Sequence, residues 1–292
     1  KILKEKIFEN IWIQPAAGDA GGSLGAALAL WHIEKGNKRY INPNDDMSGS
    51  YLGPSYKQEE IEKELKKLGA NFKVLNYEDL INQTSEKISK GNAVGWFQGR
   101  MEFGPRALGA RSILGDPRSE KMQKNLNLKV KYRESFRPFA PSVLKDDVSN
   151  WFELKTESPY MLLVADVNSN KKIQMTEKEQ KLFGIDKLNI KRSEIPAVTH
   201  VDYSARIQTV SENTNKPYYD LIQKFKEKTG CPVIVNTSFN VRGEPIVNTP
   251  TDAFNCFMGT DLDNLVIGKC FLEKNQQNSS LKKDYSKEFE LD

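Results

Sequence analysis

The chain has 292 residues, of which 38% are hydrophobic and 28% charged, an ordinary balance for a globular protein that can bury a sizeable core. No apolar run approaches the ~20 residues that a membrane-spanning helix needs, so we expect no membrane partner. Three separated cysteines without a CxxC spacing predict reduced thiols and a cytoplasmic location, and two histidines are too few for a histidine-rich metal site.

The first 36 residues predict a short strand, a glycine-rich turn and a helix that ends near Gly36. The chain enters directly into an amphipathic segment without an initiator Met, so we expect a piece of a longer protein. Within "GDAGGSLGAA", Asp19 is either a helix N-cap or a ligand-contacting residue, and the spacing favours the N-cap. Residues 37–55 are rich in Asn, Asp, Gly, Pro and Ser and predict a linker.

The rest of the chain alternates between predicted helices and strands. The pattern predicts helices over 57–69, 78–91, 119–128, 216–230 and 249–260, and strands over 71–77, 92–100, 138–145, 160–167, 231–238 and 264–274. Residues 168–195 are polar and irregular, and the tail, 274–292, has little to bury and predicts disorder. The irregular alternation predicts an α/β or α+β fold with a mixed sheet.

Positive charge is concentrated in residues 100–137, which carry a net charge of +6. The stretch begins with "GRMEFGPRALGARS", where Arg100, Arg106 and Arg111 alternate with glycines spaced five apart. Glycine lets a backbone approach a ligand, and arginine supplies a permanent planar cation. Farther along, "KVKYRESFRP" is predicted to be extended, with Lys131 and Arg133 pointing the same way before Arg137. Binding of several anions explains this pattern better than a solvated face.

Two further stretches place polar side chains on predicted strands. "THVDYSARIQTV" aligns five polar side chains on one strand face, either as a solvated face or as substrate contacts, with neither reading favoured. They are His200, Asp202, Ser204, Arg206 and Gln208. "VIVNTSFNVRGEP" is an apolar strand that leads into polar residues at a position suited to a ligand, although a capped polar turn is the alternative. The polar residues of this second stretch are Asn236, Thr237, Ser238, Asn240 and Arg242.

Four ordered stretches together resemble the O-carbamoyltransferase family, which includes nodulation-factor and antibiotic carbamoyltransferases. They are "PAAGDAGGSLGAAL", "GWFQGRMEFGPRALGARSILGDPR", "KYRESFRPFAPSVL" and "PVIVNTSFN". The resemblance implies that residues 1–36 are the last piece of an actin/acetate-kinase-type domain, similar to that of tRNA threonylcarbamoyl transferases. It implies that 37–55 are a linker and that 56–273 form a YrdC-like α/β domain with a twisted mixed sheet.

The resemblance also implies a two-stage reaction. ATP with Mg²⁺ and carbamoyl phosphate would give carbamoyl-adenylate, pyrophosphate and phosphate in the YrdC-like domain. The carbamoyl group would then pass to a hydroxyl of a sugar, antibiotic or natural-product intermediate in the front domain. That domain holds a divalent metal (Fe²⁺, Mn²⁺ or Zn²⁺) through two histidines and an aspartate. Asp19 matches the aspartate, and we expect this chain alone to hold the metal poorly.

By resemblance, the catalytic cations that bind phosphate and carboxylate are Arg100, Arg106, Arg111, Lys131, Arg133 and Arg137. The predicted substrate- and nucleotide-binding residues are His200, Asp202, Arg206, Asn236, Thr237, Ser238, Asn240 and Arg242. Two alternatives remain open. The first is a tRNA-type threonylcarbamoyl-adenylate synthase that takes threonine and bicarbonate. The second is a non-catalytic RNA-binding module, which we favour less because the positive charge is interleaved with glycines and buried-strand patterns.

Overall fold

A computed structural model describes residues 2–9, 11–41, 45–188, 190–285 and 289. Its centre is a sheet of nine strands in the order β1-β9-β8-β2-β3-β7-β4-β6-β5. The pairs β2–β8 and β4–β6 are parallel and the others antiparallel, so the predicted mixed α/β class is confirmed. The strands are β1 (Lys73–Val74), β2 (Val94–Phe97), β3 (Arg111–Gly115), β4 (Ala140–Leu144), β5 (Leu163–Asp166), β6 (Ser204–Val210), β7 (Val233–Ser238), β8 (Asn264–Ile267) and β9 (Cys270–Glu273).

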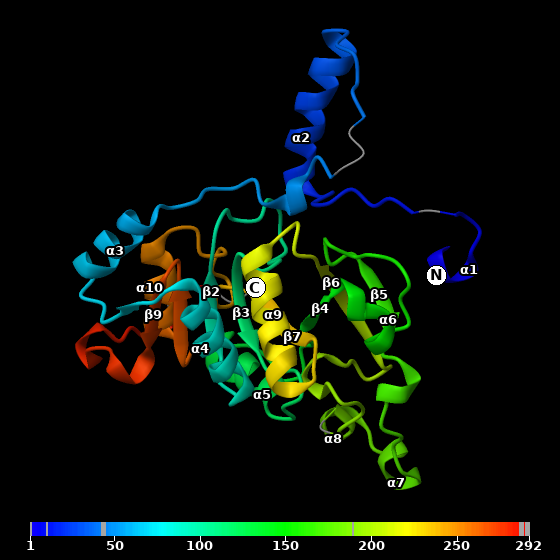
Figure 1. The fold of residues 1–292 in the computed structure, drawn as a ribbon. Coiled ribbons are helices and arrows are strands. Elements are labelled where there is room, and N and C mark those ends of the chain that lie inside the picture. The colour runs from blue at the N-terminus through cyan, green and yellow to red at the C-terminus, as the bar shows by residue number, and fades with distance from the viewer. Residues whose placement is uncertain (1, 10, 42–44, 189, 286–288, 290–292) are drawn as a thin grey trace.

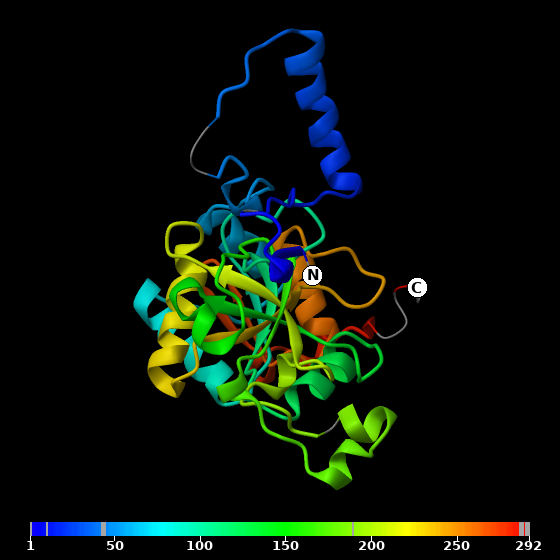
Figure 2. The ribbon, with the colours of Figure 1, turned by 90° about the vertical axis from the view of Figure 1, so that its right-hand side faces the viewer.

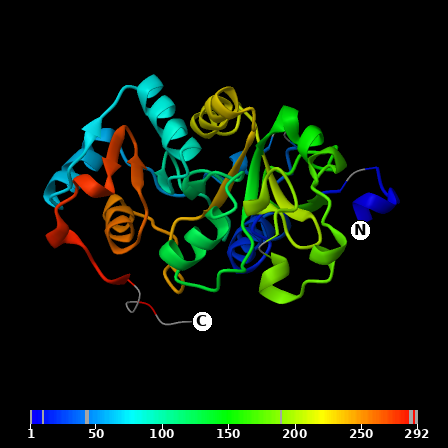
Figure 3. The same ribbon diagram turned by 90° about the horizontal axis from the view of Figure 1, so that it is seen from below.

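Helices cover both faces of this sheet. Seen from below, α4 and α9 lie on one side, and α5 and α10 lie on the other (Figure 3). The α-helices are α1 (Ile2–Glu5), α2 (Asp19–Ala29), α3 (Gln58–Lys67), α4 (Tyr77–Ser89), α5 (Met122–Asn125), α6 (Val148–Trp151), α7 (Glu177–Gln180), α8 (Gly184–Leu188), α9 (Lys216–Thr229) and α10 (Pro250–Gly259). Two π-helical turns, Leu30–Glu34 and Leu126–Val130, follow α2 and α5 directly. No helix in the described ranges is long and apolar enough to cross a membrane.

The helices on both faces explain why the central strands are buried along their whole length. Every residue of β2, β3 and β8 is buried, because helices cover both faces of these strands. The covering helices carry clear end signals. Asn76 caps α4 by accepting a hydrogen bond from the Asp79 amide, and α9 ends at Gly230 in the left-handed conformation. Their apolar residues recur at helical spacing and face the sheet.

Several sequence predictions of secondary structure differ from the structure. The predicted strand 264–274 is a hairpin of β8 and β9, which turns at Gly268 with a φ of 54°. Strand β3 was not predicted, because its arginine and glycines interrupt the apolar run. Residues 11–14 form no strand. Lys131 continues a π-helical turn and Tyr132 has a φ of 48°, so the predicted extended stretch at Lys131–Arg133 is wrong.

The N-terminal segment stands apart from this body. Helix α2 and the π-helical turn after it project away from the sheet, and none of their residues is buried (Figures 1 and 2). Gly18 occupies the N-cap position and Asp19 is the first helical residue, so the N-cap prediction for Asp19 is wrong by one residue. The base of the segment meets the arginine-rich loop, where a Cβ on Gly104 would lie 2.6 Å from the Cβ of Ala16.

The predicted linker and the predicted disordered tail both make contacts with the body of the protein. In the linker 37–55, Ser50 is buried and the Gly53 amide donates a hydrogen bond to the Met101 carbonyl. In the tail 274–292, Tyr285 is buried against Gly259, so the described part packs on the body. Residues 42–44, 286–288 and 290–292 of these two predicted segments lie outside the described residues.

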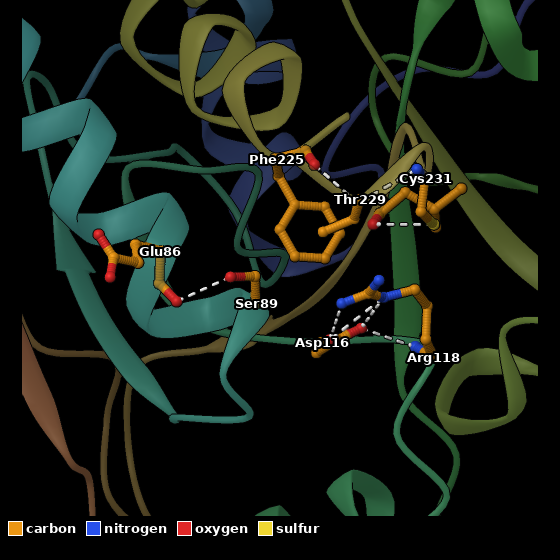
Figure 4. A network of polar contacts seen from close by, with 8 residues as sticks. Glu86, Ser89, Asp116, Arg118, Phe225, Thr229 and Cys231 are labelled. Atoms are coloured by element: carbon orange, nitrogen blue, oxygen red, sulfur yellow. Dashed lines mark hydrogen bonds and ion pairs between the residues drawn. The ribbon is translucent and has the colours of Figure 1, made fainter. Parts of the chain in front are cut away.

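A polar network ties the end of β3 to the end of α9 (Figure 4). The Arg118 guanidinium donates to both carboxylate oxygens of buried Asp116, and its Cζ lies 5.3 Å from the centre of the Phe225 ring. Thr229 donates to the Phe225 carbonyl and accepts from the Cys231 amide. This network fixes the chain where it leaves α9 and enters β7, the strand that carries Asn236 and Ser238.

Gly109 gives a test of the close packing around the arginine-rich loop. Its φ is 105°, and a Cβ there would collide with the Tyr218 ring. Gly109→Ala should therefore lower the free energy of unfolding by about 2–5 kcal/mol, from the left-handed backbone and from overpacking together. The matched control is Gly230→Ala, which has a φ of 74° but open space around it. Gly230→Ala should lower the free energy of unfolding by only about 1–2 kcal/mol. Urea unfolding measures both, and equal losses would contradict the packing argument.

Candidate functional site

Two of the three arginines in "GRMEFGPRALGARS" hold the loop itself. The Arg111 side chain is fully buried over the Phe97 ring, 3.5 Å from Cζ to the ring centre, and donates to main-chain carbonyls that include those of Gln98 and Pro54. Burial lowers the pKa of Arg111 to about 10, so it stays charged at neutral pH. Arg100 donates to the carbonyls of Leu52 and Gly53. This geometry differs from the predicted anion binding by Arg100 and Arg111.

Unlike Arg100 and Arg111, Arg106 has a side chain that binds no main-chain carbonyl in the part of the chain that the structure describes. It is exposed, and among the described residues it makes no hydrogen bond or ion pair. It lines a cavity of about 210 Å³ between the loop and the segment around Ala16. Arg206, on β6, is close enough that the charge of Arg106 adds to burial in lowering the pKa of Arg206. An exposed cation at the wall of a cavity is suited to hold a small anion.

Lys131 is a deeply buried cation of the predicted set, with 3% of its surface exposed. Its Nζ donates to the carbonyls and side-chain oxygens of Ser238 and Asn240, at 3.1 Å to Ser238 Oγ and 2.7 Å to Asn240 Oδ1. Ser238 Oγ also donates to Asn240 Oδ1, so the three side chains form one network. Burial, followed by the charge of Arg133, lowers the pKa of Lys131 to about 7.

An open cavity of about 400 Å³ lies beside this network. Its wall brings together Lys131, Arg133, Arg137, Ser238, Asn240 and Arg242, six of the residues that the sequence singled out. Gly243, with a φ of 76°, turns the loop that returns toward Glu244 and closes one side. The cavity is therefore a polar hollow with four cations, two small polar side chains and a turn of backbone.

The arginines of the cavity are held by residues that the sequence analysis did not single out. Fully buried Asn127 accepts from Arg133 Nε at 2.7 Å and donates to the Arg137 carbonyl at 2.8 Å. Glu134 pairs with Arg137 at 3.0 Å and lies 3.7 Å from Arg242. Glu244 accepts from the Val241 amide. Asn127, Glu134 and Glu244 bind groups on irregular backbone around the cavity. Helix and strand periodicity does not predict contacts of this kind.

Asn236 contacts the arginine-rich loop and does not reach the Lys131 cavity. Its side chain donates to the Ala107 carbonyl at 3.0 Å and to Gln208 Oε1 at 2.8 Å. The predicted nucleotide contact by Asn236 thus becomes a loop contact in the structure. Thr237 is half-buried on the opposite face of β7 and does not line the cavity.

The predicted strand face of His200, Asp202 and Arg206 does not form as one unit. Strand β6 begins only at Ser204, and the residues before it make a turn with Tyr203 at a φ of 65°. Asp202 caps this turn by accepting from the Ser204 amide and hydroxyl. Burial lowers the pKa of His200 despite the nearby Asp202 carboxylate. His200 and Asp202 therefore belong to a turn, whereas Arg206 lies on β6, where the charge of Arg106 lowers its pKa.

Asp19 lies exposed in the first turn of α2. Across the described ranges, no group of three or more His, Cys, Asp or Glu side chains is placed to hold a metal ion. These residues alone therefore do not make the predicted metal site, and the role of Asp19 as one ligand stays a prediction.

Comparison with known proteins defines the family. A family model described as the carbamoyltransferase C-terminus matches residues 85–274. The chain therefore belongs to the carbamoyltransferase C-terminal family, and the resemblance stated from its motifs is confirmed.

The relatives are longer proteins. The chain is 56% identical over its whole length to an uncharacterized protein of Synechocystis sp., of which it covers 48%. It is 41% identical over 94% of its length to the nodulation protein NolNO of Sinorhizobium fredii, of which it covers 37%. It is 29% identical over 91% of its length to the 3'-hydroxymethylcephem-O-carbamoyltransferase of Amycolatopsis lactamdurans, of which it covers 44%. The chain thus spans less than half the length of these relatives.

Among solved structures, HypF of T. kodakarensis is similar with a TM-score of 0.39 and 18% sequence identity. The likeness covers 60% of this chain and 19% of that one.

Arg106 and Arg111 differ in a way that unfolding measurements can separate. Arg111→Leu should lower the free energy of unfolding by roughly 3 kcal/mol or more, because each buried acceptor left unpaired costs about 1–3 kcal/mol. Arg106→Leu removes an exposed side chain and should change it by no more than about 0.5 kcal/mol. Chemical denaturation measures both, and similar losses would contradict the division of roles.

The lowered pKa of Lys131 predicts a pH dependence of anion binding. A lysine with a pKa of about 7 is charged below that value and loses its charge above it. Sulfate does not titrate in this range, so its affinity should fall about tenfold between about pH 6 and pH 9 as one charge-assisted bond is lost. Calorimetric titration of sulfate measures the effect. Lys131→Met should bind more weakly and show no such fall, and an equal fall in both proteins would contradict the assignment.

Proposed function

We propose that this chain carries the adenylate-forming part of a carbamoyltransferase, in which ATP and carbamoyl phosphate give carbamoyl-adenylate, pyrophosphate and phosphate. The observation that carries the proposal is the cavity beside Lys131, where Arg133, Arg137 and Arg242 face a space bordered by Ser238 and Asn240. Fixed cations around phosphoryl groups stabilise the charge that develops during phosphoryl and nucleotidyl transfer. The activity in the name of the Amycolatopsis relative, 3'-hydroxymethylcephem-O-carbamoyltransferase, supports a carbamoyl group as the group transferred.

The atoms balance when one water molecule enters. Hydrolysis of carbamoyl phosphate gives carbamate and phosphate. A carbamate oxygen then attacks the α-phosphorus of ATP, the new O–P bond forms, and the bond to pyrophosphate breaks with its electron pair on the leaving group. In this scheme the arginines and Lys131 bind and orient phosphate oxygens and offset the charge on pyrophosphate as it departs.

The two cationic groups in the structure suit two anionic substrates. The larger cavity of about 400 Å³, with Lys131 and the Ser238–Asn240 pair, suits the polyphosphate of ATP. The Lys-x-Arg and Ser-x-Asn elements resemble those of YrdC-type nucleotide sites, which supports this choice. Arg106 and Arg206 then remain for carbamoyl phosphate. We assign transfer to the acceptor hydroxyl, together with the metal and Asp19, to an actin/acetate-kinase-type domain, of which residues 1–36 resemble the last piece.

Pyrophosphate release from Mg-ATP tests the proposal. Release should require carbamoyl phosphate, and Arg133→Ala should slow it roughly a hundredfold, as for loss of one donor to a developing anion. The matched control is Lys178→Ala, an exposed cation on α7, which should leave the rate unchanged. Release that needs threonine and bicarbonate would favour the threonylcarbamoyl-adenylate alternative. Equal rates and equal Mg-ATP affinities in the two variants would contradict a nucleotide site at Arg133.

A further inference from the structure

Glu102 is a buried carboxylate that the proposed chemistry does not use. It lies in the loop between β2 and β3, four residues before Arg106, and is 6% exposed. Its Oε1 accepts hydrogen bonds from three main-chain amides, at 2.7 Å from Leu108, 2.7 Å from Ala110 and 3.3 Å from Arg111. The first two amides belong to the turn that follows Arg106, and the third belongs to the first residue of β3. One carboxylate oxygen thus accepts hydrogen bonds from several main-chain amides at and after that turn.

The carbonyls of the same turn are held as well. The Ala107 carbonyl accepts from Asn236, and the Gly109 carbonyl accepts from Trp96 Nε1 at 3.0 Å. The Leu108 carbonyl accepts from Tyr51 at 2.7 Å and from Gln208 at 2.8 Å. These four donors come from β7, β2, the segment before α3 and β6. The turn is therefore fixed from both its donor and its acceptor sides.

Arg106 needs such a fixed backbone. Its charge reaches Arg206, where it lowers the pKa, and like charges repel each other. A long exposed side chain on a mobile loop would therefore move away from the cavity that Arg106 lines. Preorganised cations hold an anion better, since they lose less conformational freedom on binding.

We propose that Glu102 is a positioning residue, which fixes the turn after Arg106 so that Arg106 binds an anion at the cavity that it lines. The role rests on the proposed function only for the identity of that anion, carbamoyl phosphate. The fixing of the turn stands on the contacts alone.

A double-mutant cycle with sulfate as the probe tests this role. Glu102→Met has similar size but no acceptor. In the Lys131→Met background, which reduces binding in the other cavity, it should weaken by about tenfold the component of sulfate binding that Arg106→Leu removes. In the Arg106→Leu background, Glu102→Met should have no further effect, because the site that it positions is already lost. Glu102→Gln keeps an acceptor oxygen and should restore binding to within about threefold of wild type. Hydrogen exchange at the Leu108 and Ala110 amides should be faster in Glu102→Met alone.

Unchanged sulfate affinity in Glu102→Met would overturn the proposal, and so would equal weakening with and without Arg106. If Glu102→Met does not fold, Glu102→Asp takes its place, since it moves the carboxylate by one methylene and keeps the charge. Pyrophosphate release is not part of this cycle. The proposed reaction can therefore fail while the role of Glu102 stands, and the role of Glu102 can fail while the reaction stands.

Discussion

Residues 98–110 connect β2 to β3 through backbone that has no strand or helix to satisfy its peptide groups. Much of this backbone is buried, and a buried peptide group left without a partner costs about 1–3 kcal/mol. Side chains supply the partners. Arg111 takes carbonyls at the start of the loop, and Glu102 takes amides at its end. Arg111 and Glu102 thus stabilise the fold of the loop. Arg106 is the charged residue of the motif that makes no hydrogen bond or ion pair with the described residues.

Local patterns predicted a large part of the fold. Helices α4 and α9 could be predicted because their caps and their apolar faces lie in neighbouring residues. The role of Arg111 could not, because its carbonyl partner Pro54 is 57 residues away and carbonyls carry no sequence signal. Lys131 and Ser238 are 107 residues apart, and only the family resemblance suggested that they act together. Glu102 and Asn127 were missed for the same reason, since they bind backbone and not a ligand.

The two kinds of cation at the site have different physical properties. Arg133 has a pKa of about 10 despite burial, so its charge persists at neutral pH. Lys131 has lost most of its hydration, and its four oxygen acceptors replace the water that an ammonium group prefers. An anion in the cavity would add a further partner and favour the charged form. Charge on Lys131 and occupation of the cavity are therefore coupled.

Strand β7 lies between β3 and β4 in the sheet, although it comes more than a hundred residues after β3 in the chain. Asn236 and Ser238 both sit on it, so neither the turn after Arg106 nor the Lys131 network is complete until β7 has inserted. Pairings this distant in sequence form late and slow the folding of a domain. Until β7 has been synthesised, the edges of β3 and β4 that pair with it have unpaired peptide groups, and such edges can pair with other chains. Insertion of β7 therefore completes the site and also removes two edges that could cause aggregation.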